Sequence, residues 1–387
     1  MINKSTIPGH WEIKSLKDVC RKISLNKIKI KQKDYLTQGS FPVVDQGSEL
    51  IGGYCDETEF IVPEEPPYII FGDHTKVKKY INFKFIAGAD GVKVLKSNSK
   101  IDPKFLYYVL HIIKIPDKGY ARHFQFLEKE NFPLPPLNEQ QQIVSKIEEL
   151  FSELDKGKQQ LETVKQQLKT YRHSLLNTIV RDKNSQPIGS AIAKLDQGWS
   201  PKCLNEPSNN EDEWAVIKTS AVQHGTFIAF QNKILPKELK PRIQHELKAG
   251  DILITRAGPR IRVGVCCMVK KIRPKLINCD KVYRIRVNER ILSSAYLELV
   301  LNTPYYQHEI EKMKTGISDS GVNLTQTQFL KIQISIPTLK EQQNIVSEIE
   351  TRLLVCDKME ETIEYSLRQV ESLRQSILKQ AFEGKLV

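Results

Sequence analysis

The sequence LPPLNEQQQIVS at residues 134–145 returns as IPTLKEQQNIVS at residues 336–347. The two copies lie 202 residues apart, and this spacing holds without a gap as far as Leu176 and Leu378. Chance similarity between two helices would not keep one register over this length. We therefore interpret the chain as an internal repeat.

Both copies continue as predicted long helices, because apolar residues follow in steps of three and four. In the first copy these residues are Ile143, Ile147, Leu150, Leu154, Leu161, Val164, Leu168, Tyr171 and Leu175. In the second copy they are Ile345, Ile349, Cys356, Met359, Ile363, Val370, Leu373 and Ile377. Such a stripe is typical of helix packing, and we expect each helix to be the partner of the other. A proline-containing segment precedes each helix, the first should end near residues 181–184, and the second near Gly384.

The order of the segments predicts the direction of the two helices. Residues 183–337 separate them, and a compact domain of about 155 residues has a radius of gyration of about 15 Å. A helix of about 44 residues is about 66 Å long. The second helix should therefore begin near the end of the first and run back beside it, as an antiparallel coiled coil with a domain at either end and a pseudo-two-fold axis.

The two remaining regions predict mixed α+β domains. Short apolar runs bounded by turn-forming residues indicate strands, at Phe60–Val62, Tyr68–Phe71, Phe85–Ala87, Val92–Leu95, Trp214–Ile217, Asp251–Thr255 and Val263–Cys266. One helix is expected late in each region, at Pro103–Ile113 and Ser294–Leu301. The predicted fold is thus α+β, with two strand-rich domains (1–137 and 183–337), each followed by a long helix (138–182 and 338–387).

Composition restricts the class of protein. The 387 residues are 40% apolar and carry a formal net charge of +12, which fits either a polyanionic partner or a solvated basic surface. The seven cysteines form no C-x-x-C, so we expect buried thiols in a reducing cytosol. No apolar stretch reaches the length of a membrane span and the first residues lack a signal-peptide pattern, so we expect a soluble cytoplasmic protein.

These features resemble the specificity subunits of Type I restriction–modification systems. The motifs that carry the resemblance are Pro135–Gln140 and Pro337–Gln342 at the two helix starts, and the ending Gln380–Val387. Gly198–Cys203 and Asp251–Gly258 are similar to the opening and to a strand and turn of the family's second recognition domain. The resemblance extends over essentially the whole chain.

The resemblance implies a non-catalytic subunit that reads a bipartite, asymmetric site in double-stranded DNA. It implies assembly with two methyltransferase subunits and with restriction/translocase subunits. S-adenosylmethionine, ATP and magnesium would be held by those partners, and this chain would bind no cofactor of its own. A related pair of readers also fits the two-fold symmetry of a duplex, with half-sites about one turn apart.

Basic and aromatic residues beside glycine turns are the candidate DNA contacts, because phosphate contacts supply affinity and base contacts supply specificity. In the first domain they are Lys76, Lys78, Lys79, Tyr120, Arg122 and His123. In the second domain they are Arg256, Arg260, Arg262 and Lys314. Each cluster has the alternative of a solvated face, the histidine that of an ordinary loop residue, and the tyrosine that of a core residue.

The repeated helix starts offer a candidate surface for the methyltransferase subunits. It consists of Glu139, Gln140 and Gln141 with their repeats Glu341, Gln342 and Gln343. The alternative for the acidic residues is capping of the positive helix end. Both roles are compatible.

Two other classes of function fit the sequence less well. Glu65-Pro66-Pro67-Tyr68 superficially resembles the Asn/Asp-Pro-Pro-Tyr motif of adenine methyltransferases, but it begins with Glu and no glycine-rich cofactor loop precedes it. No phosphate-binding G-x-x-x-x-G-K-[ST] loop or zinc-ligand spacing is present, so no catalytic or metal-binding residue is predicted. A structural coiled-coil scaffold would explain the helices, but not two large basic domains in repeat position.

Overall fold

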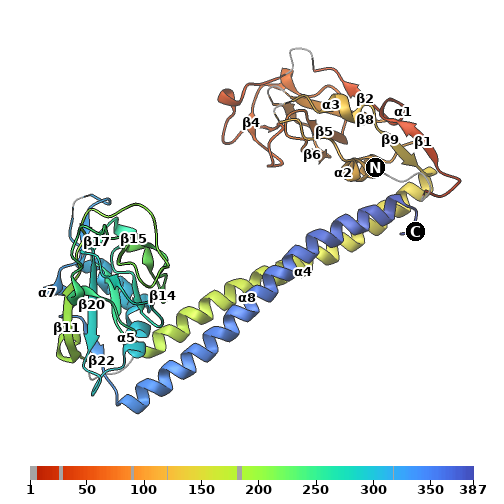
Figure 1. The fold of residues 1–387 in the computed structure, drawn as a ribbon. Coiled ribbons are helices and arrows are strands. Elements are labelled where there is room, and N and C mark those ends of the chain that lie inside the picture. Colours follow the sequence, from red (N-terminus) through yellow and green to blue (C-terminus); the bar gives the residue numbers. More distant parts are fainter. Residues whose placement is uncertain (1–6, 26–28, 89–90, 120, 181–184, 317) are drawn as a thin grey trace. The chain divides into compact units, whose positions relative to one another are not determined.

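The computed structural model describes residues 7–25, 29–88, 91–119, 121–180, 185–316 and 318–387. They form two compact units: unit 1 comprises residues 1–162 and 363–387, and unit 2 comprises residues 163–362. Each unit contains one globular domain and a part of each of two long helices, α4 (Leu137–Asn177) and α8 (Leu339–Phe382) (Figure 1).

The domain of unit 1 is built on three small sheets. The largest has the order β2 (Cys20–Ile23), β8 (Val92–Ser97), β5 (Tyr68–Gly72) and β6 (Lys78–Ile81), all antiparallel. The second has the order β4 (Gly53–Cys55), β3 (Phe41–Val44) and β7 (Ile86–Ala87), and the third pairs β1 (Glu12–Ser15) with β9 (Asn131–Leu134). The helices are α1 (Leu16–Val19), α2 (Pro103–Ile112) and α3 (Phe124–Leu127), with short turns η2 (Gln32–Asp34) and η3 (Thr58–Phe60).

The strand β5 lies at the centre of this domain, because both of its faces are buried. Ile69 and Phe71 pack into one apolar cluster, and Tyr68 and Ile70 pack into another. Successive side chains of a strand point to opposite faces, so a continuous apolar run suits a strand that is covered on both sides. The prediction of a strand here is confirmed.

The domain of unit 2 has three corresponding sheets. Their orders are β11 (Ile192–Gln197), β20 (Val282–Val287), β16 (Ile252–Thr255) and β18 (Cys266–Met268); β15 (Asn232–Ile234), β12 (Ala215–Ile217) and β19 (Leu276–Ile277); and β10 (Ser185–Pro187) with β22 (Gln333–Ser335). Two further ribbons pair β13 (Val222–Gln223) with β14 (Thr226–Phe227), and β17 (Ala257–Gly258) with β21 (Val322–Asn323). The helices are α5 (Ser294–Leu301), α6 (Pro304–Met313) and α7 (Gln326–Phe329). The short turns are η4 (Thr178–Val180), η5 (Ile188–Ala191), η6 (Thr219–Ala221), η7 (Ile243–His245) and η8 (Arg260–Arg262).

The two domains share one topology. The four-stranded sheets, the three-stranded sheets and the terminal pairs match strand for strand in chain order, including the parallel pairs β3 with β7 and β12 with β19. In this correspondence β5 matches β16, and the short helix α3 matches α7. Unit 2 adds α6 and the ribbons β13–β14 and β17–β21. The α+β class and the two strand-rich domains were predicted from the sequence and are confirmed.

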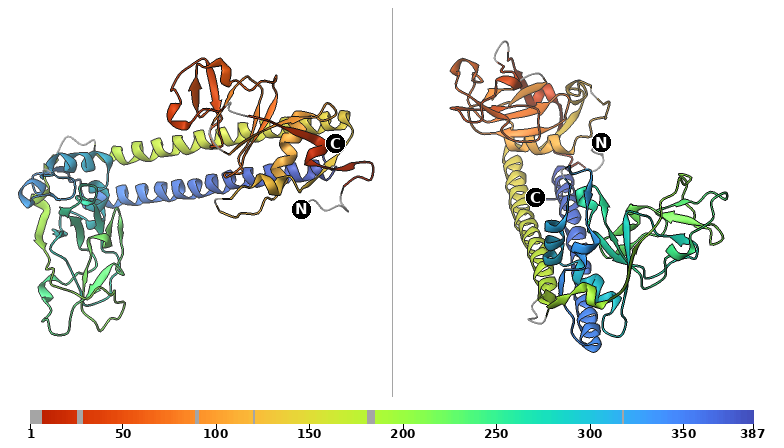
Figure 2. Two further views of the ribbon diagram at one scale, coloured as in Figure 1. Left: turned by 90° about the horizontal axis from the view of Figure 1, so that it is seen from above. Right: turned by 90° about the vertical axis from the view of Figure 1, so that its left-hand side faces the viewer.

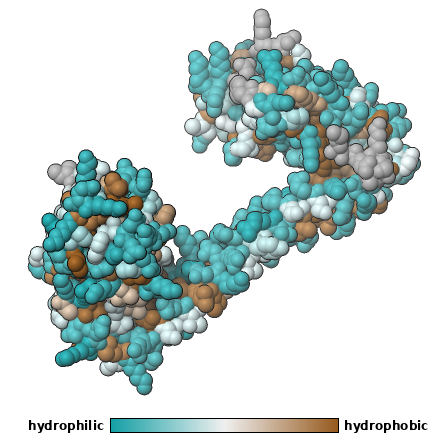
Figure 3. All heavy atoms as spheres, viewed as in Figure 1, coloured by the Kyte–Doolittle hydropathy of each residue, from teal (hydrophilic) through white to brown (hydrophobic). Residues whose placement is uncertain are grey.

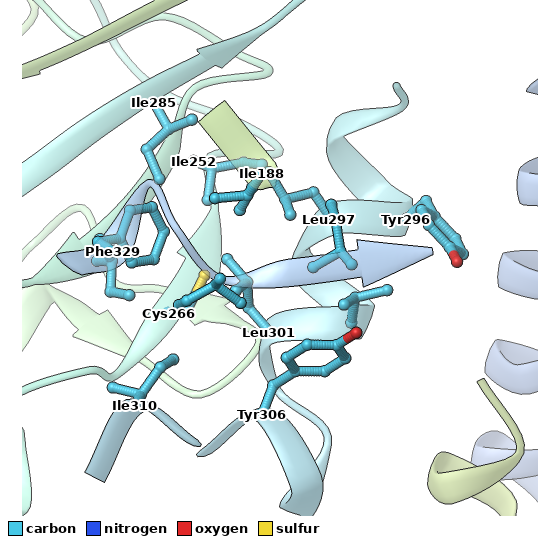
Figure 4. Close-up of a cluster of buried hydrophobic side chains, with 14 of the residues drawn as sticks. Ile188, Ile252, Cys266, Ile285, Tyr296, Leu297, Leu301, Tyr306, Ile310 and Phe329 are labelled. Carbon is cyan, nitrogen blue, oxygen red and sulfur yellow. The ribbon is translucent and has the colours of Figure 1, made fainter. Parts of the chain in front are cut away.

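The core of unit 2 gathers side chains from most of its elements. Figure 4 shows Ile252 and Ile285 from the sheet, Leu297 and Leu301 from α5, and Phe329 from α7 converging on one cluster. The same cluster includes Leu175 of α4 and Ile349 of α8, while Phe382 of α8 belongs to the core of unit 1. The helix segments are therefore parts of the two cores.

Within each unit, the segments of α4 and α8 lie side by side (Figure 2). In unit 1, Asp155 pairs with Arg374, and Lys158 pairs with Glu371 at 3.6 Å. In unit 2, Arg172 pairs with Asp357. Each step forward along α4 matches an equal step backward along α8, so the pairing is antiparallel as predicted.

The ion pairs also reveal the repeat. The pair of Asp155 with Arg374 is the same pair as that of Asp357 with Arg172, with the two helices exchanged. Arg374 stacks in addition on the ring of Phe151 at 4.7 Å. The two units thus repeat one local contact.

The apolar stripe of the helices is only partly covered. Ile147, Cys356 and Ile363 are buried, whereas Tyr171 and Met359 are 45% and 44% exposed. Two helices bury a single narrow line between them, and apolar side chains on its flanks stay in contact with solvent. Figure 3 shows apolar areas on the helices within a mostly hydrophilic surface.

Several predicted boundaries are corrected. Phe60–Val62 is not a strand: Phe60 is the last residue of the short helix η3, and Ile61 makes a single bridge, to Ile86. The strand expected at Val263–Cys266 begins at Cys266, because the turn before it includes Gly264 at a φ of +88°. The helix α4 ends at Asn177, earlier than expected, and residues 181–184 lie outside the described residues. The helix α8 ends at Phe382, with Gly384 in the left-handed conformation at φ +67°.

Each long helix is fixed to its domain by one buried glutamine. The amide of Gln140 accepts a hydrogen bond from the backbone N–H of Asp102 at 2.8 Å, and it donates to the carbonyls of Lys100 and Pro135 at 3.3 and 2.9 Å. In unit 2, Gln342 accepts from the N–H of Ser293 and donates to the carbonyls of Ile291 and Pro337, each at 2.8 Å. These side chains are 1% and 0% exposed.

We predict that Gln140→Leu lowers the free energy of unfolding by about 2–4 kcal/mol, because one backbone N–H and two carbonyls lose their partner in a buried place. Urea denaturation monitored by circular dichroism measures the change. The matched control is Gln141→Leu on the exposed neighbouring residue, which should stay within about 0.5 kcal/mol of the wild type. Equal stability of the two variants would contradict the anchoring role.

Candidate nucleic-acid interface

Two loops meet in each domain at equivalent places. The first follows the central strand: residues 73–77 after β5 in unit 1, and residues 256–265 after β16 in unit 2. The second precedes the short helix: residues 113–123 before α3, and residues 314–325 before α7. We call them the paired loops. Of the ten predicted DNA-contact residues, the nine that the structure describes lie on the paired loops or on the first two residues of β6.

In unit 1 the paired loops are joined through Asp73. Its backbone carbonyl accepts the N–H of His123 at 2.7 Å, and its carboxylate accepts the N–H of Phe124 at 2.8 Å. The same carboxylate, 2% exposed, pairs with Lys93 of β8 at 3.3 Å. A buried carboxylate with a cation and an N–H donor is a rigid joint, so Asp73 fixes the second loop against the first.

Two of the predicted lysines in unit 1 remain accessible. Lys76 lies at a φ of +61° and pairs with Asp117 of the second loop at 3.2 Å, with 28% of its side chain exposed. Lys78 is half-buried. Burial, together with the charge of Lys76, lowers the pKa of Lys78 to about 8. The charge of Lys78 therefore depends on its surroundings.

The structure places the other predicted residues of unit 1 differently. Arg122 is exposed. Lys79 is 4% exposed, and its ammonium binds the carbonyl of Glu49. His123 is 0% exposed, and its Nδ1 lies 3.0 Å from the carbonyl of Asp73. Burial argues against a direct DNA contact by Lys79 or His123, and Tyr120 lies outside the described residues.

In unit 2 the predicted residues hold the paired loops together. Arg260 pairs with Glu311 at 2.7 Å and with Asp319 at 3.0 Å. Lys314, 7% exposed, pairs with Glu311 at 2.5 Å and donates to the carbonyl of Arg260 at 2.9 Å. The charges of Arg260 and Lys314 are thus paired with carboxylates of the same unit, and both residues hold the two loops in position.

The other two arginines of unit 2 bind neutral groups. Arg262 donates to Gln223 Oε1 at 3.0 Å and to the carbonyls of Thr219 and Val222 at 2.9 and 2.6 Å. The Nε of Arg256 donates to the carbonyl of Asp280 at 2.8 Å, and its guanidinium lies 5.6 Å from the ring of Tyr283. Their positive charge is not cancelled by an ion pair among the residues that the structure describes.

The sequence interpretation missed Asp73 and Lys93, which organise unit 1. Lys93 also lines an open groove of about 210 Å³ together with Lys22 and Lys29. The available signal was Lys93 itself, which stands between Val92 and Val94: both valines are buried in one apolar cluster, so Lys93 points to the opposite face of the strand.

The predicted partner surface is reduced to its exposed members. Gln140 and Gln342 are buried inside their own units, which argues against a direct contact with another subunit. Gln141 and Gln343 are exposed at equivalent positions. Glu139 and Glu341 are accessible but already bound within the chain.

The two glutamates differ because of one residue. Glu341 accepts the backbone N–H and the hydroxyl of Thr338 at 2.9 and 2.6 Å, which caps α8. The equivalent residue before α4 is Pro136, which has neither group. Glu139 is thereby free to accept the Trp11 indole N–H at 2.8 Å and to bind His10 at 2.9 Å.

The described part of the chain contains no group of three or more His, Cys, Asp or Glu side chains suited to a metal ion. Within the same ranges, none of the helices combines the length and apolar character needed to cross a membrane. Six of the seven cysteines are buried, and burial raises the pKa of Cys20 to about 12.

Comparison with known proteins identifies the repeat. The family described as the Type I restriction modification DNA specificity domain matches residues 8–166 and again residues 200–369. The specificity subunit of the Type I restriction enzyme EcoEI of Escherichia coli is 41% identical over 177 residues, which are 46% of this chain and 30% of that subunit. The specificity subunit of EcoKI from Escherichia coli K12 is 30% identical over 271 residues, 66% of this chain and 58% of the relative. The chain thus spans less than two thirds of these two relatives.

Two solved structures share the fold over nearly the whole chain. A chain of a type I R-M system has a TM-score of 0.70 at 18% identity, covering 98% of this chain and 99% of that one. The HsdS subunit from Thermoanaerobacter tengcongensis has a TM-score of 0.61 at 18% identity, covering 98% of both chains.

If Lys78 contacts phosphate, we predict that its deprotonation weakens duplex binding by about threefold to tenfold between pH 7 and pH 9, in addition to any decline caused by other titrating groups. The pKa of about 8 means that Lys78 loses its proton in this interval. Burial lowers the pKa of the neighbouring His111 from its usual value near 6.5, so this histidine titrates below the interval from pH 7 to pH 9. Fluorescence anisotropy with a labelled duplex at fixed salt measures the affinity.

Two variants separate the contribution of Lys78 from other titrations. Lys78→Arg keeps its charge to pH 9 and should remove the decline, whereas Lys78→Met should bind weakly and without this pH dependence. An unchanged pH profile in both variants would show that Lys78 does not touch DNA.

Proposed function

The chain belongs to the Type I restriction modification DNA specificity family, and from this premise we propose that it reads a bipartite, asymmetric DNA target for a Type I restriction–modification complex. Each domain reads one half-site through its paired loops. The chain supplies recognition, and the chemistry of methylation or cleavage belongs to partner subunits.

One observation carries this proposal: two domains of identical topology present unlike residues at equivalent loops. Unit 1 offers Lys76, Lys78 and Arg122 there, and unit 2 offers Arg256 and Arg262. An arginine can bind guanine through two hydrogen bonds, and a lysine serves mainly as a phosphate contact. Equal scaffolds with unequal contacts suit two half-sites of different sequence.

The net charge of +12 supports DNA as the polyanionic partner. The rigid joints at Asp73 and at Arg260 support specificity, because loops that are ordered before binding lose little conformational entropy on the DNA. A structural scaffold would need neither feature.

We further propose that two methyltransferase subunits dock at the helix starts, where Gln141 and Gln343 are exposed at equivalent positions. Restriction/translocase subunits would join the same complex. S-adenosylmethionine would then be held by the methyltransferase subunits, and ATP with magnesium by the restriction subunits.

The structure disfavours the methyltransferase alternative, because the segment that suggested it, Glu65-Pro66-Pro67-Tyr68, is not placed as a substrate site. Glu65 is exposed and pairs with Lys84 at 2.8 Å. Tyr68 is 0% exposed inside the core and does not face a substrate site. This segment leads the chain into β5, so its residues serve packing.

We predict that cells which contain this chain together with its methyltransferase partner methylate adenine at one bipartite sequence, and that the methylation disappears when either is deleted. Genome-wide mapping of methyladenine identifies the target. In vitro, the complex should lose affinity for that duplex steeply as salt rises. Methylation by this chain alone would favour the enzyme alternative, and a complete lack of salt-dependent duplex binding by the complex would favour the scaffold.

The helices are expected to govern the gap between the half-sites, because they are the segments that run from one unit into the other. Insertion of seven residues after Lys158 in α4 and before Glu371 in α8 keeps the remaining antiparallel pairs in register. Seven residues add about 10 Å of helix, close to three base pairs. We predict that the mapped gap changes and that both half-site sequences are retained.

The control inserts the seven residues into α4 alone, which shifts the pairing of Arg172 with Asp357 and should abolish stable folding or binding. Altered half-site bases with an unaltered gap in the double insertion would refute the spacing role of the helices.

A further inference from the structure

Ile261 is exposed to an unusual degree. It lies in the middle of the turn η8, within the paired loops of unit 2, and its side chain is 85% exposed. No other large apolar side chain in the described ranges reaches this value; Leu354 follows at 69%. An apolar side chain that is exposed to this degree adds almost nothing to the free energy of folding, and its place within the paired loops makes Ile261 a candidate contact for the ligand.

The backbone on both sides of Ile261 is held in place. The N–H of Arg260 donates to the carbonyl of Asp319 at 2.8 Å, and the carbonyl of Arg260 accepts the ammonium of Lys314 at 2.9 Å. The carbonyl of Arg262 accepts the hydroxyl of Thr255. The turn is therefore fixed before any ligand arrives.

The side chains that flank Ile261 are hydrogen-bonded to other parts of the domain. Arg260 is bound by Glu311 and Asp319, and Arg262 is bound by Gln223 and two backbone carbonyls. These bonds leave the isoleucine as the projecting group between two anchored arginines. A pre-ordered apolar side chain can be inserted at little entropic cost.

The charge around the turn favours a polyanion over an apolar protein surface. Arg256 and Arg262 bind only neutral groups among the described residues, so they keep a positive field beside Ile261. Proteins that bend or probe DNA use isoleucine, leucine or phenylalanine as wedges between bases, and apolar groups also contact the methyl group of thymine.

We infer, resting on the proposed function, that Ile261 is a specificity-determining apolar contact to the bases of the half-site read by unit 2. The equivalent loop of unit 1 presents Lys76, which is 28% exposed and bound to Asp117. Among the described residues of the paired loops of unit 1, no large apolar side chain is exposed in this way, so we expect the apolar contact on one half-site.

The test uses the full chain in complex with its methyltransferase partner and a duplex that carries the mapped target. Ile261→Ala should weaken binding to the target by about tenfold, comparable with one mismatched base pair. The loss should be absent on an unrelated duplex. Ile261→Leu should retain most of the affinity, because an apolar side chain of equal volume remains.

The position of the contact on the DNA is found by changing the DNA. Each thymine of the target is replaced by uracil, or a base is replaced by 2-aminopurine, whose fluorescence rises when it loses stacking. Ile261→Ala should become insensitive to one such change, and only in one half-site. Ile291→Ala, a half-exposed isoleucine of the same unit, is the matched control and should bind as the wild type does.

Three outcomes overturn the inference while the proposed function stands. They are equal target binding by Ile261→Ala and the wild type, an equal loss on target and unrelated DNA, and a loss of assembly with the methyltransferase partner in place of a loss of DNA discrimination. Failure of the wild-type complex to distinguish its target from unrelated DNA would overturn the proposed function itself. Thermal unfolding of Ile261→Ala should match the wild type, since the side chain is almost fully exposed.

Discussion

The antiparallel packing of α4 against α8 is the constraint on which both units depend. Unit 1 needs the end of α8, because Leu378, Ala381 and Phe382 belong to its core beside Ile143 and Ile147 of α4. Unit 2 needs the end of α4 and the start of α8 in the same way. Each ion pair at the helix surface contributes at most about 1 kcal/mol to the free energy of unfolding. The buried apolar side chains between the helices and the two buried glutamines therefore contribute most of the free energy that holds the helices in place.

The sequence predicted much of the fold because repetition and periodicity are local signals. The repeat of Pro135–Gln140 located both helix starts, and apolar runs located β5, β12 and β16, while α5 was predicted at its observed bounds. Phe60–Val62 was wrong because an apolar run does not reveal whether a partner strand is present. The role of Gln140 was hidden for a related reason: its three hydrogen bonds connect residues that are close in space and up to 40 positions apart.

The candidate DNA contacts remain a prediction, but the structure shows which of these side chains are exposed and which are bound within the protein. Charged residues beside turns mark a loop, but the sequence does not tell whether the charge faces solvent or a carboxylate. Arg260 and Lys314 are bound to Glu311, and Lys79 is buried. Such residues give the loops their shape, which leaves direct reading to the few side chains that remain exposed.

Each unit uses segments of both long helices, and this sharing suggests how a chain of this kind could arise. One domain with one long helix is half of the repeat, and alone it lacks the second helix that completes its core. Such a half would have to associate with a second copy, and a homodimer of that kind has two identical heads. Fusion of two such copies into one polypeptide would allow the two heads to differ, and the equivalent helix starts of this chain do differ, with Pro136 before α4 and Thr338 before α8.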